Sequence, residues 1–153
     1  MTVAGQWHPV TGAPHAATVP MSTDPPLRVL LVEDSALLTS RIAELIRRLP
    51  DVTLIDTVDA EAEALRRLAE AAPDVVILDL HLRIGSGFGV LRSLERGVAR
   101  RPKIIILTGF DLPEYRREAE AFGVEAFLNK SRDYGRLPSL LSSLAKQLSA
   151  DNP

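Results

Sequence analysis

The sequence predicts an α/β fold, a (βα)5 chain whose doubly wound, five-stranded parallel sheet carries helices on both faces. Two observations predict this class. Short apolar runs alternate with amphipathic segments from residue 27 onward. Three of the runs are rich in β-branched residues, as is typical of strands that helices cover on both sides.

The expected strands differ in how apolar they are. The three central runs are Leu27–Val32 (LRVLLV), Val75–Leu78 (VVIL) and 104–107 (IIIL). Val52–Val58 (VTLIDTV) is more mixed, which favours an edge strand. A short fifth strand is expected over 126–128, after a helix stop at Gly123.

Helices are expected between the strands because apolar residues there recur at helical spacing. The first covers 35–49, and the third runs from about 88 to 96, where Gly97 follows. Asp59 and Asp111 are placed to act as N-caps of the second and fourth helices. The last helix starts no earlier than about 135, because Pro138 would break a helix interior, and its leucine pattern ends at residue 148.

Length and composition describe one globular domain of a chain of 153 residues. The chain has no cysteine, which excludes disulfides, thiolate zinc sites and a cysteine nucleophile. A formal net charge of −2 gives no broad attraction to nucleic acid. No apolar run is long enough for a membrane helix and no signal peptide is recognisable, so we expect a cytoplasmic protein without a membrane partner.

Three segments are expected along the chain. Residues 1–26 hold five of the eleven prolines and few large apolar residues, which predicts a disordered tail in which Trp7 is exposed. Residues 27–148 form the folded domain, and 149–153 are expected to be a short flexible C-terminus. Met21 precedes a polar leader, so one hypothesis places the native translation start there.

Polar side chains follow four of the predicted strands. They are Glu33 and Asp34, Asp79, Thr108, and Lys130. Because the carboxyl ends of parallel strands meet at one edge of the sheet, these groups should lie together. Each has a local alternative: Asp34 or Asp79 as a cap, Thr108 bonded to a loop, and Lys130 as a surface charge.

As a set, these groups predict phosphoryl chemistry. Neighbouring carboxylates repel one another unless a cation lies among them, and oxygen ligands favour Mg²⁺. A hydroxyl and an ammonium group facing a carboxylate could hold a phosphoryl group attached to it. The pattern therefore favours metal-assisted phosphoryl transfer onto an aspartate.

Four motifs carry a resemblance to a known family. LVEDS at 31–35, VILDL at 76–80, IILTG at 105–109 and AFLNK at 126–130 resemble the receiver domain of two-component response regulators, in order and at the usual separations. The resemblance covers residues 27 to about 148. It implies the flavodoxin-like strand order 2-1-3-4-5 and a protein that signals by being phosphorylated, catalysing only its own phosphorylation and dephosphorylation.

The resemblance assigns a role to each matching position. Asp79 is similar to the phosphoacceptor that takes a phosphoryl group from a sensor histidine kinase or a histidine phosphotransfer protein. Glu33 and Asp34 match the acidic pair that binds Mg²⁺ together with Asp79, and the backbone carbonyl of His81 matches the remaining protein ligand. Thr108 and Lys130 match the pair that contacts the phosphoryl oxygens.

The resemblance also implies how a signal leaves the site. Phe127 stands at the place of the switch aromatic that responds to Thr108, with ordinary strand packing as the alternative. His81 and Phe110 occupy the two variable positions that tune the phosphoryl lifetime. The 110–128 surface is then the expected signalling face, and 110–150 is a candidate homodimer surface.

The chain departs from the family pattern beside the site. Ser131 stands where many receivers have a proline after the lysine, so a trans loop is expected over 129–136. Arg83 stands where a proline is common, while Gly85 and Gly87 supply turn freedom. Neither change removes a reacting group.

The leading hypothesis is a single-domain response regulator that relays phosphate, acts as a phosphate sink or contacts an unknown downstream protein. One alternative is a receiver-like binding module that works without phosphorylation. A second is a small aspartyl-phosphate phosphohydrolase, which would be expected to carry a second Asp where His81 stands. A third, a flavin or nucleotide binder, is opposed by a first strand–helix turn without glycine.

Overall fold

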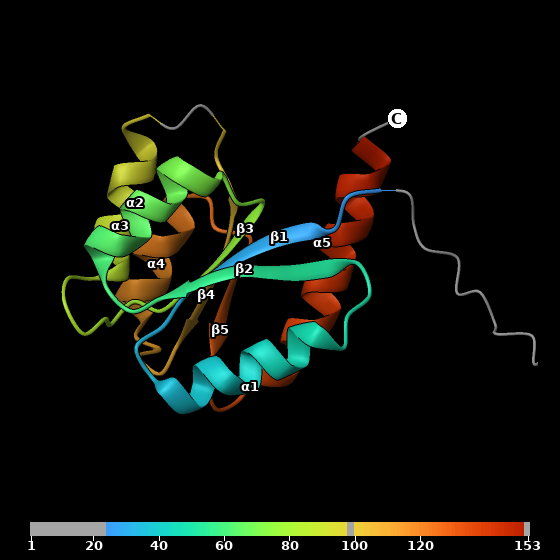
Figure 1. Ribbon diagram of the computed structural model, residues 1–153. Helices are drawn as coiled ribbons and strands as arrows, with labels where there is room; N and C mark the ends of the chain where they lie inside the picture. The colour runs from blue at the N-terminus through green and yellow to red at the C-terminus, as the bar shows by residue number, and fades with distance from the viewer. Residues whose placement is uncertain (1–23, 98–99, 152–153) are drawn as a thin grey trace, which may run out of the picture.

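The computed structural model describes residues 24–97 and 100–151, and in that part of the chain strands alternate with helices (Figure 1). All pairings in the sheet are parallel, in the order β2-β1-β3-β4-β5. The predicted doubly wound (βα)5 fold is confirmed. The elements are β1 (Leu27–Val32), α1 (Ala36–Arg47), β2 (Val52–Val58), α2 (Glu61–Ala71), β3 (Val75–Leu78), α3 (Gly87–Glu95), β4 (Lys103–Thr108), α4 (Pro113–Ala121), β5 (Ala126–Asn129), the short 3₁₀ helix η1 (Tyr134–Arg136) and α5 (Leu137–Asp151).

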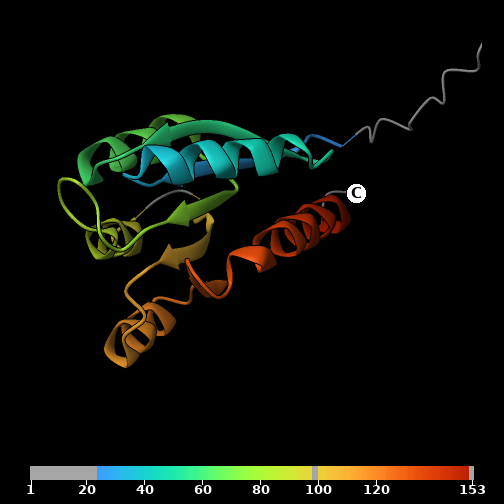
Figure 2. The same cartoon turned by 90° about the horizontal axis from the view of Figure 1, so that it is seen from below.

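Two apolar cores lie on opposite faces of the sheet. Helices α1 and α5 cover one face, where Ile42 and Leu141 pack against the strands. Helices α2, α3 and α4 cover the other, where Leu68 and Leu91 are among the buried residues. In both views the strands run between α5 and the group of α2, α3 and α4 (Figures 1 and 2). The sheet is therefore the rigid centre of the domain.

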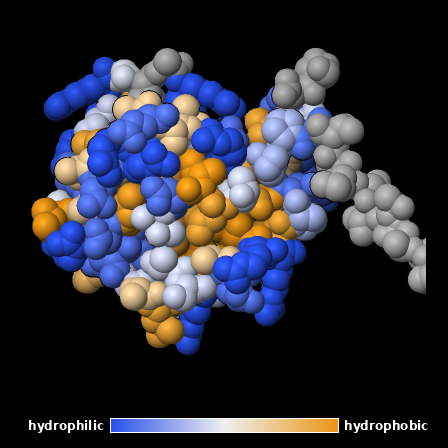
Figure 3. Space-filling model, in the orientation of Figure 1, coloured by the Kyte–Doolittle hydropathy of each residue, from blue (hydrophilic) through white to orange (hydrophobic). Residues whose placement is uncertain are grey.

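The inner strands are buried on both faces, as their apolar runs predict. β3 is buried throughout, and β4 is buried from Ile104 to Thr108. β2 lies at the edge, and its middle residues are only partly covered. Apolar surface gathers over β2 and beside α1 (Figure 3), where Leu49, Val52 and Leu54 line a shallow groove.

The predicted aspartate caps are wrong. Helix α2 begins after Ala60 and α4 after Leu112, and neither residue makes a side-chain cap. Asp59 and Asp111 bind arginines instead, because a guanidinium offers a carboxylate two charged hydrogen bonds where a helix end offers a neutral N–H. Ser35 caps α1, so the alternative cap role of Asp34 is also wrong.

The C-terminal helix is longer than predicted. It continues to Asp151, so residues 149–151 are helical where a flexible C-terminus was expected. Leu148 packs against the core, and no glycine or proline follows it before Pro153. The predictions for the tail over 1–23, including Trp7 and Met21, fall outside the described residues, as do those for 152–153.

A buried strand residue tests the central core. Ile77→Ala in β3 should lower the free energy of unfolding by about 2–5 kcal/mol, because Ile77 is 1% exposed and its loss leaves a cavity. Leu37→Ala is the matched control: Leu37 is 65% exposed, and a change within about 0.5 kcal/mol is expected. Urea denaturation of both variants measures the difference, and equal effects would contradict this view of the core.

Candidate functional site

The carboxyl ends of four strands bring the candidate residues together. Glu33 and Asp34 follow β1, and Asp79 follows β3 directly. Thr108 is the last residue of β4, and Lys130 comes just after β5. β1 and β3 are neighbours although β2 separates them in sequence, so the acidic groups meet where the strand order reverses. Open α/β sheets place their binding sites at this point.

Three carboxylates form one cluster. An oxygen atom from each of Glu33, Asp34 and Asp79 lies within 4.8 Å of the others. Glu33 and Asp79 are each 4% exposed, whereas Asp34 is exposed to solvent. Buried charges are costly unless they are paired, so the arrangement needs positive charge close by.

Lys130 supplies part of that charge. Its Nζ donates to Oδ2 of Asp79 at 2.7 Å and to Oε1 of Glu33 at 3.0 Å. Burial by itself would lower the pKa of Lys130, but the hydrogen bonds and charges of the two acids outweigh it and hold the pKa above its usual value. Lys130 is therefore a permanent cation that faces two buried carboxylates.

The burial of Glu33 changes its acidity. Burial raises its pKa above the ordinary value, and the negative charge of Asp79 adds to this rise. A hydrogen bond from the Ser35 N–H at 3.0 Å and the contacts with Lys130 oppose the rise without cancelling it. Burial is therefore the main reason that Glu33 holds a proton more readily than an ordinary glutamate.

These residues fit a divalent cation such as Mg²⁺. All the side-chain donors are carboxylate oxygens, which Mg²⁺ prefers, and one of the three carboxylates faces solvent. Lys130 contacts two of the three carboxylates, so one ammonium group faces three acidic side chains and a further cation would be favoured. The backbone carbonyl of His81, the fourth predicted ligand, belongs to the loop that leaves Asp79.

The remaining contacts of Asp79 and Thr108 come from the backbone. The N–H of His81 donates to Oδ1 of Asp79 at 3.2 Å, so both carboxylate oxygens of Asp79 are engaged. Thr108 is fully buried, and its Oγ1 accepts the Phe110 N–H at 3.3 Å. The hydroxyl proton of Thr108 remains a donor.

Two glycines after Asp79 have different functions. Gly85 has φ +82°, a conformation that side chains disfavour, so the predicted turn freedom holds there. Gly87 is needed instead for close approach, because a Cβ there would overlap the carbonyl of Asp79 and lie 2.9 Å from Cα of Leu80. The first turn of α3 is therefore packed directly on the backbone of Asp79.

The two residues predicted to tune phosphoryl lifetime touch each other. The rings of His81 and Phe110 stack with centroids 3.7 Å apart and an interplanar angle of 28°. Phe110 is 50% exposed, and Tyr115 lies against the same imidazole, 6.2 Å between centroids. This stack joins the loops that follow β3 and β4.

Phe127 belongs to a charged network that the sequence did not reveal. The Arg116 guanidinium lies 4.6 Å from the centre of the Phe127 ring, a cation–π geometry. Asp111 accepts two hydrogen bonds from Arg116, at 2.6 and 2.8 Å, and also binds Arg132. Arg116 follows Asp111 by five residues, and this spacing is the only signal of the pairing in the sequence.

The 129–136 loop is trans, as Ser131 predicts. Oδ1 of Asn129 accepts the N–H groups of Ser131 and Arg132, at 2.8 and 3.2 Å, and the Asp133 N–H donates to the Asn129 carbonyl. These bonds turn the chain tightly just after Lys130.

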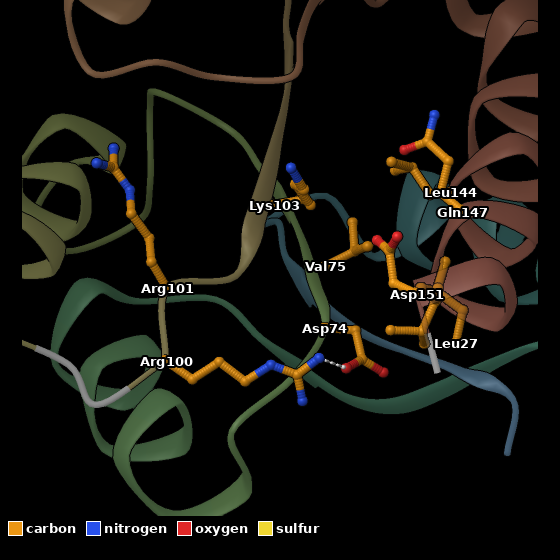
Figure 4. A pocket seen from close by; sticks show the side chains of 10 residues that line it. Leu27, Asp74, Val75, Arg100, Arg101, Lys103, Leu144, Gln147 and Asp151 are labelled. Atoms are coloured by element: carbon orange, nitrogen blue, oxygen red, sulfur yellow. Dashed lines mark ion pairs between the residues drawn. The ribbon is translucent and has the colours of Figure 1, made fainter. Parts of the chain in front are cut away.

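A cavity of about 510 Å³ lies at the amino ends of the strands, on the side of the sheet opposite to the carboxylate cluster (Figure 4). Arg100 pairs with Asp74 there at 3.0 Å, and Asp74 also accepts the Arg28 N–H at 2.9 Å. Leu27 and Val75 mark this as the amino end of the strands, away from Asp79. The hydrogen bond between Arg28 of β1 and Asp74, just before β3, joins the beginnings of these two neighbouring strands.

The sheet order and its acidic edge define a class: doubly wound α/β domains whose site lies at the reversal of strand order. A family model of the response regulator receiver domain matches residues 29–142. The chain therefore belongs to the receiver domain family of two-component response regulators.

No helix in the described part of the chain is long and apolar enough to cross a membrane.

Curated relatives are longer than this chain. The sensory transduction protein LytT of Bacillus cereus is 31% identical over 123 residues, which are 79% of this chain and 48% of that protein. A protein-glutamate methylesterase/protein-glutamine glutaminase 2 of Koribacter versatilis is 32% identical over 127 residues, 82% of this chain and 33% of that protein. The chain thus spans half or less of these relatives.

Solved structures agree with the fold over nearly their whole length. A DNA-binding response regulator of the LuxR family from Staphylococcus aureus superposes with a TM-score of 0.70 at 26% identity, covering 78% of this chain and 98% of that one. The response regulator domain of CheB from Thermotoga maritima gives 0.69 at 21% identity, covering 84% and 99%, and supports the fold alone.

The Asp111 network should respond only to strong acid. Hydrogen bonds from Arg116 lower the pKa of Asp111 from 3.8 to about 2, so the network stabilises the fold above pH 3.8 and its contribution is lost as the pH falls through about 2. The stability difference between the wild type and Asp111→Asn should be constant above about pH 4 and shrink below it. Denaturation curves from pH 7 to 2.5 measure it, and a difference that grows in acid would contradict the assignment.

Proposed function

We propose that the chain accepts a phosphoryl group on Asp79 from a phosphohistidine of a sensor kinase or phosphotransfer protein. The observation that carries the proposal is the convergence of an acidic cluster, a buried hydroxyl and a lysine on one aspartate. Family membership supports it, since all of these groups lie within the matched residues 29–142.

In the proposed reaction an oxygen of Asp79 attacks phosphorus. The P–N bond to the donor imidazole breaks as the O–P bond of an acyl phosphate forms, and the imidazole nitrogen leaves with the electron pair and takes up a proton. Lys130, at 2.7 Å from Asp79, lies where it can contact the transferred oxygens. The hydroxyl group of Thr108 can donate a hydrogen bond to a second phosphoryl oxygen.

Glu33, Asp34, Asp79 and the His81 carbonyl are the proposed ligands of Mg²⁺. When bound, the ion would supply positive charge that offsets the negative charge of the acceptor carboxylate and of the incoming phosphoryl group. The support for this assignment is the donor set, three carboxylates with oxygens within 4.8 Å of one another, of which Lys130 contacts two.

Output is proposed to pass through the loop after β4. Phosphorylation adds about one negative charge and three acceptor oxygens at Asp79. Thr108 and residues 109–112 can then move toward the phosphoryl group and vacate space beneath Phe127. The exposed side chains of Phe110 and Leu112 favour the 110–128 surface as the contact for a downstream protein and 110–150 as a homodimer surface.

The His81–Phe110 stack is proposed to govern how long the phosphoryl group lasts. Phe110 stands on the loop that follows Thr108 and obstructs an attacking water molecule, and the imidazole beneath it fixes its place. His81 can either block water or orient it, so the two rings act together on hydrolysis.

The acceptor assignment is tested by labelling. Asp79→Asn should abolish phosphate incorporation, whereas Thr108→Ala should still be labelled but respond less to partners, because it loses the coupling hydroxyl and keeps the acceptor. Asp56→Asn, which changes a β2 carboxylate paired with Arg67, is the control and should be labelled normally. Labelling that survives Asp79→Asn would overturn the proposal.

The metal assignment is tested by titration. Asp34→Asn should weaken Mg²⁺ binding at least about tenfold, because it removes the carboxylate that faces solvent in the cluster. Calorimetry measures the affinity without any phosphoryl donor. Glu70→Gln removes the same charge from an exposed position on α2 and should bind Mg²⁺ as the wild type does. Equal affinities for the wild type and Asp34→Asn would contradict the metal site.

A further inference from the structure

The beginning of α2 holds the loop that follows Asp79. The Glu61 N–H donates to the Ile84 carbonyl at 3.1 Å, and the Ser86 N–H donates to Oε2 of Glu61 at 2.9 Å. Beside them, Arg83 forms two hydrogen bonds with Asp59, at 3.0 and 3.2 Å. Hydrogen bonds and ion pairs of residues 59–61 therefore hold the loop over 83–86 against the beginning of α2, and we call this set of contacts the clasp.

Glu61 is the main contact of this clasp. Its carboxylate is partly buried and accepts a charge-assisted hydrogen bond from Ser86, whereas the Arg83–Asp59 pair is about half exposed and so contributes little. A Cβ at Gly85 or Gly89 would overlap the Glu61 side chain. The loop and the first turn of α3 are thus shaped around this carboxylate.

The clasped loop reaches the acceptor through His81. Ser86, which Glu61 holds, forms an antiparallel bridge with His81 across the loop. The His81 N–H in turn donates to Oδ1 of Asp79. The backbone hydrogen bond beside this bridge runs from the Gly87 N–H to the Leu80 carbonyl at 3.0 Å, so Glu61 is connected to the carboxylate of Asp79 through the paired backbone of the loop.

We propose that Glu61 is a positioning residue for the phosphorylation site. By fixing Ser86 it fixes the His81 backbone, which orients Asp79 and presents the carbonyl proposed as a metal ligand. The metal-binding and phosphorylation parts of this inference rest on the proposed function. The positioning of the loop rests on the contacts alone.

Two substitutions remove the contact in different ways. Glu61→Ala deletes the carboxylate, and Gly89→Ala leaves it in the chain but displaces it from Ser86. Both should speed amide hydrogen exchange at Ser86 and His81 in the metal-free protein. Both should also weaken Mg²⁺ affinity about tenfold, the usual effect of losing a group that orients a metal ligand. The double variant should be no weaker than either single one, because the same contact is lost once.

The controls separate positioning from charge and from folding. Glu63→Ala removes the other acidic residue of the first turn of α2, which acts on the loop through the charge of the exposed Arg83, whereas the Ser86 N–H is bound by Glu61, so amide exchange at Ser86 and His81 should be unchanged. Glu61→Gln keeps an acceptor oxygen for Ser86 and should restore most of the affinity. Phosphorylation by phosphoramidate should need more Mg²⁺ in Glu61→Ala, with a rate at saturating Mg²⁺ closer to the wild type.

Three results would overturn the inference. The first is amide hydrogen exchange at Ser86 and His81 that stays as in the wild type in both Glu61→Ala and Gly89→Ala. The second is faster exchange in these variants without any change in Mg²⁺ affinity. The third is a loss of Mg²⁺ affinity in Glu63→Ala as large as that in Glu61→Ala. A failure of the proposed function is recognised separately, since the wild type itself would then bind no Mg²⁺ or incorporate no phosphate. If Glu61→Ala does not fold, Gly89→Ala and Glu61→Gln decide the question.

Discussion

The ion pairs of Lys130 with Asp79 and Glu33 are the interaction on which the site depends. Two carboxylates are almost fully buried just after the neighbouring strands β1 and β3, and the ammonium group of Lys130, just after β5, faces both. Removing either partner would leave a buried charge unpaired, which costs several kcal/mol. The rest of the arrangement follows from this constraint, because the sheet must bring β1, β3 and β5 to one edge for the charges to meet.

Much of the fold and most of the site residues follow from local sequence patterns. The inner strands are recognisable because burial on both faces demands unbroken apolar residues. The site residues are recognisable because a parallel sheet brings whatever follows each strand to the same edge, so Glu33, Asp79, Thr108 and Lys130 could be placed together without a structure.

What the sequence could not predict are contacts between loops. Asp59 and Asp111 carry the local pattern of helix caps, and only the folded chain brings Arg83 and Arg116 within reach of them. Glu61 is separated from Ser86 by 25 residues and resembles any acidic residue in a first helical turn. The end of α5 was missed for a simpler reason: an apolar pattern marks the buried face, and a helix continues past it until a residue stops it.

The contact at Gly87 has a mechanical consequence. With no room for even a methyl group between this residue and the carbonyl of Asp79, the backbone of Asp79 and the first turn of α3 are in direct contact. Interiors are close-packed and hardly compressible, so a force on one is transmitted to the other with little loss. A protein that binds and shifts α3 would therefore also shift the backbone of Asp79, the residue proposed as the phosphoryl acceptor.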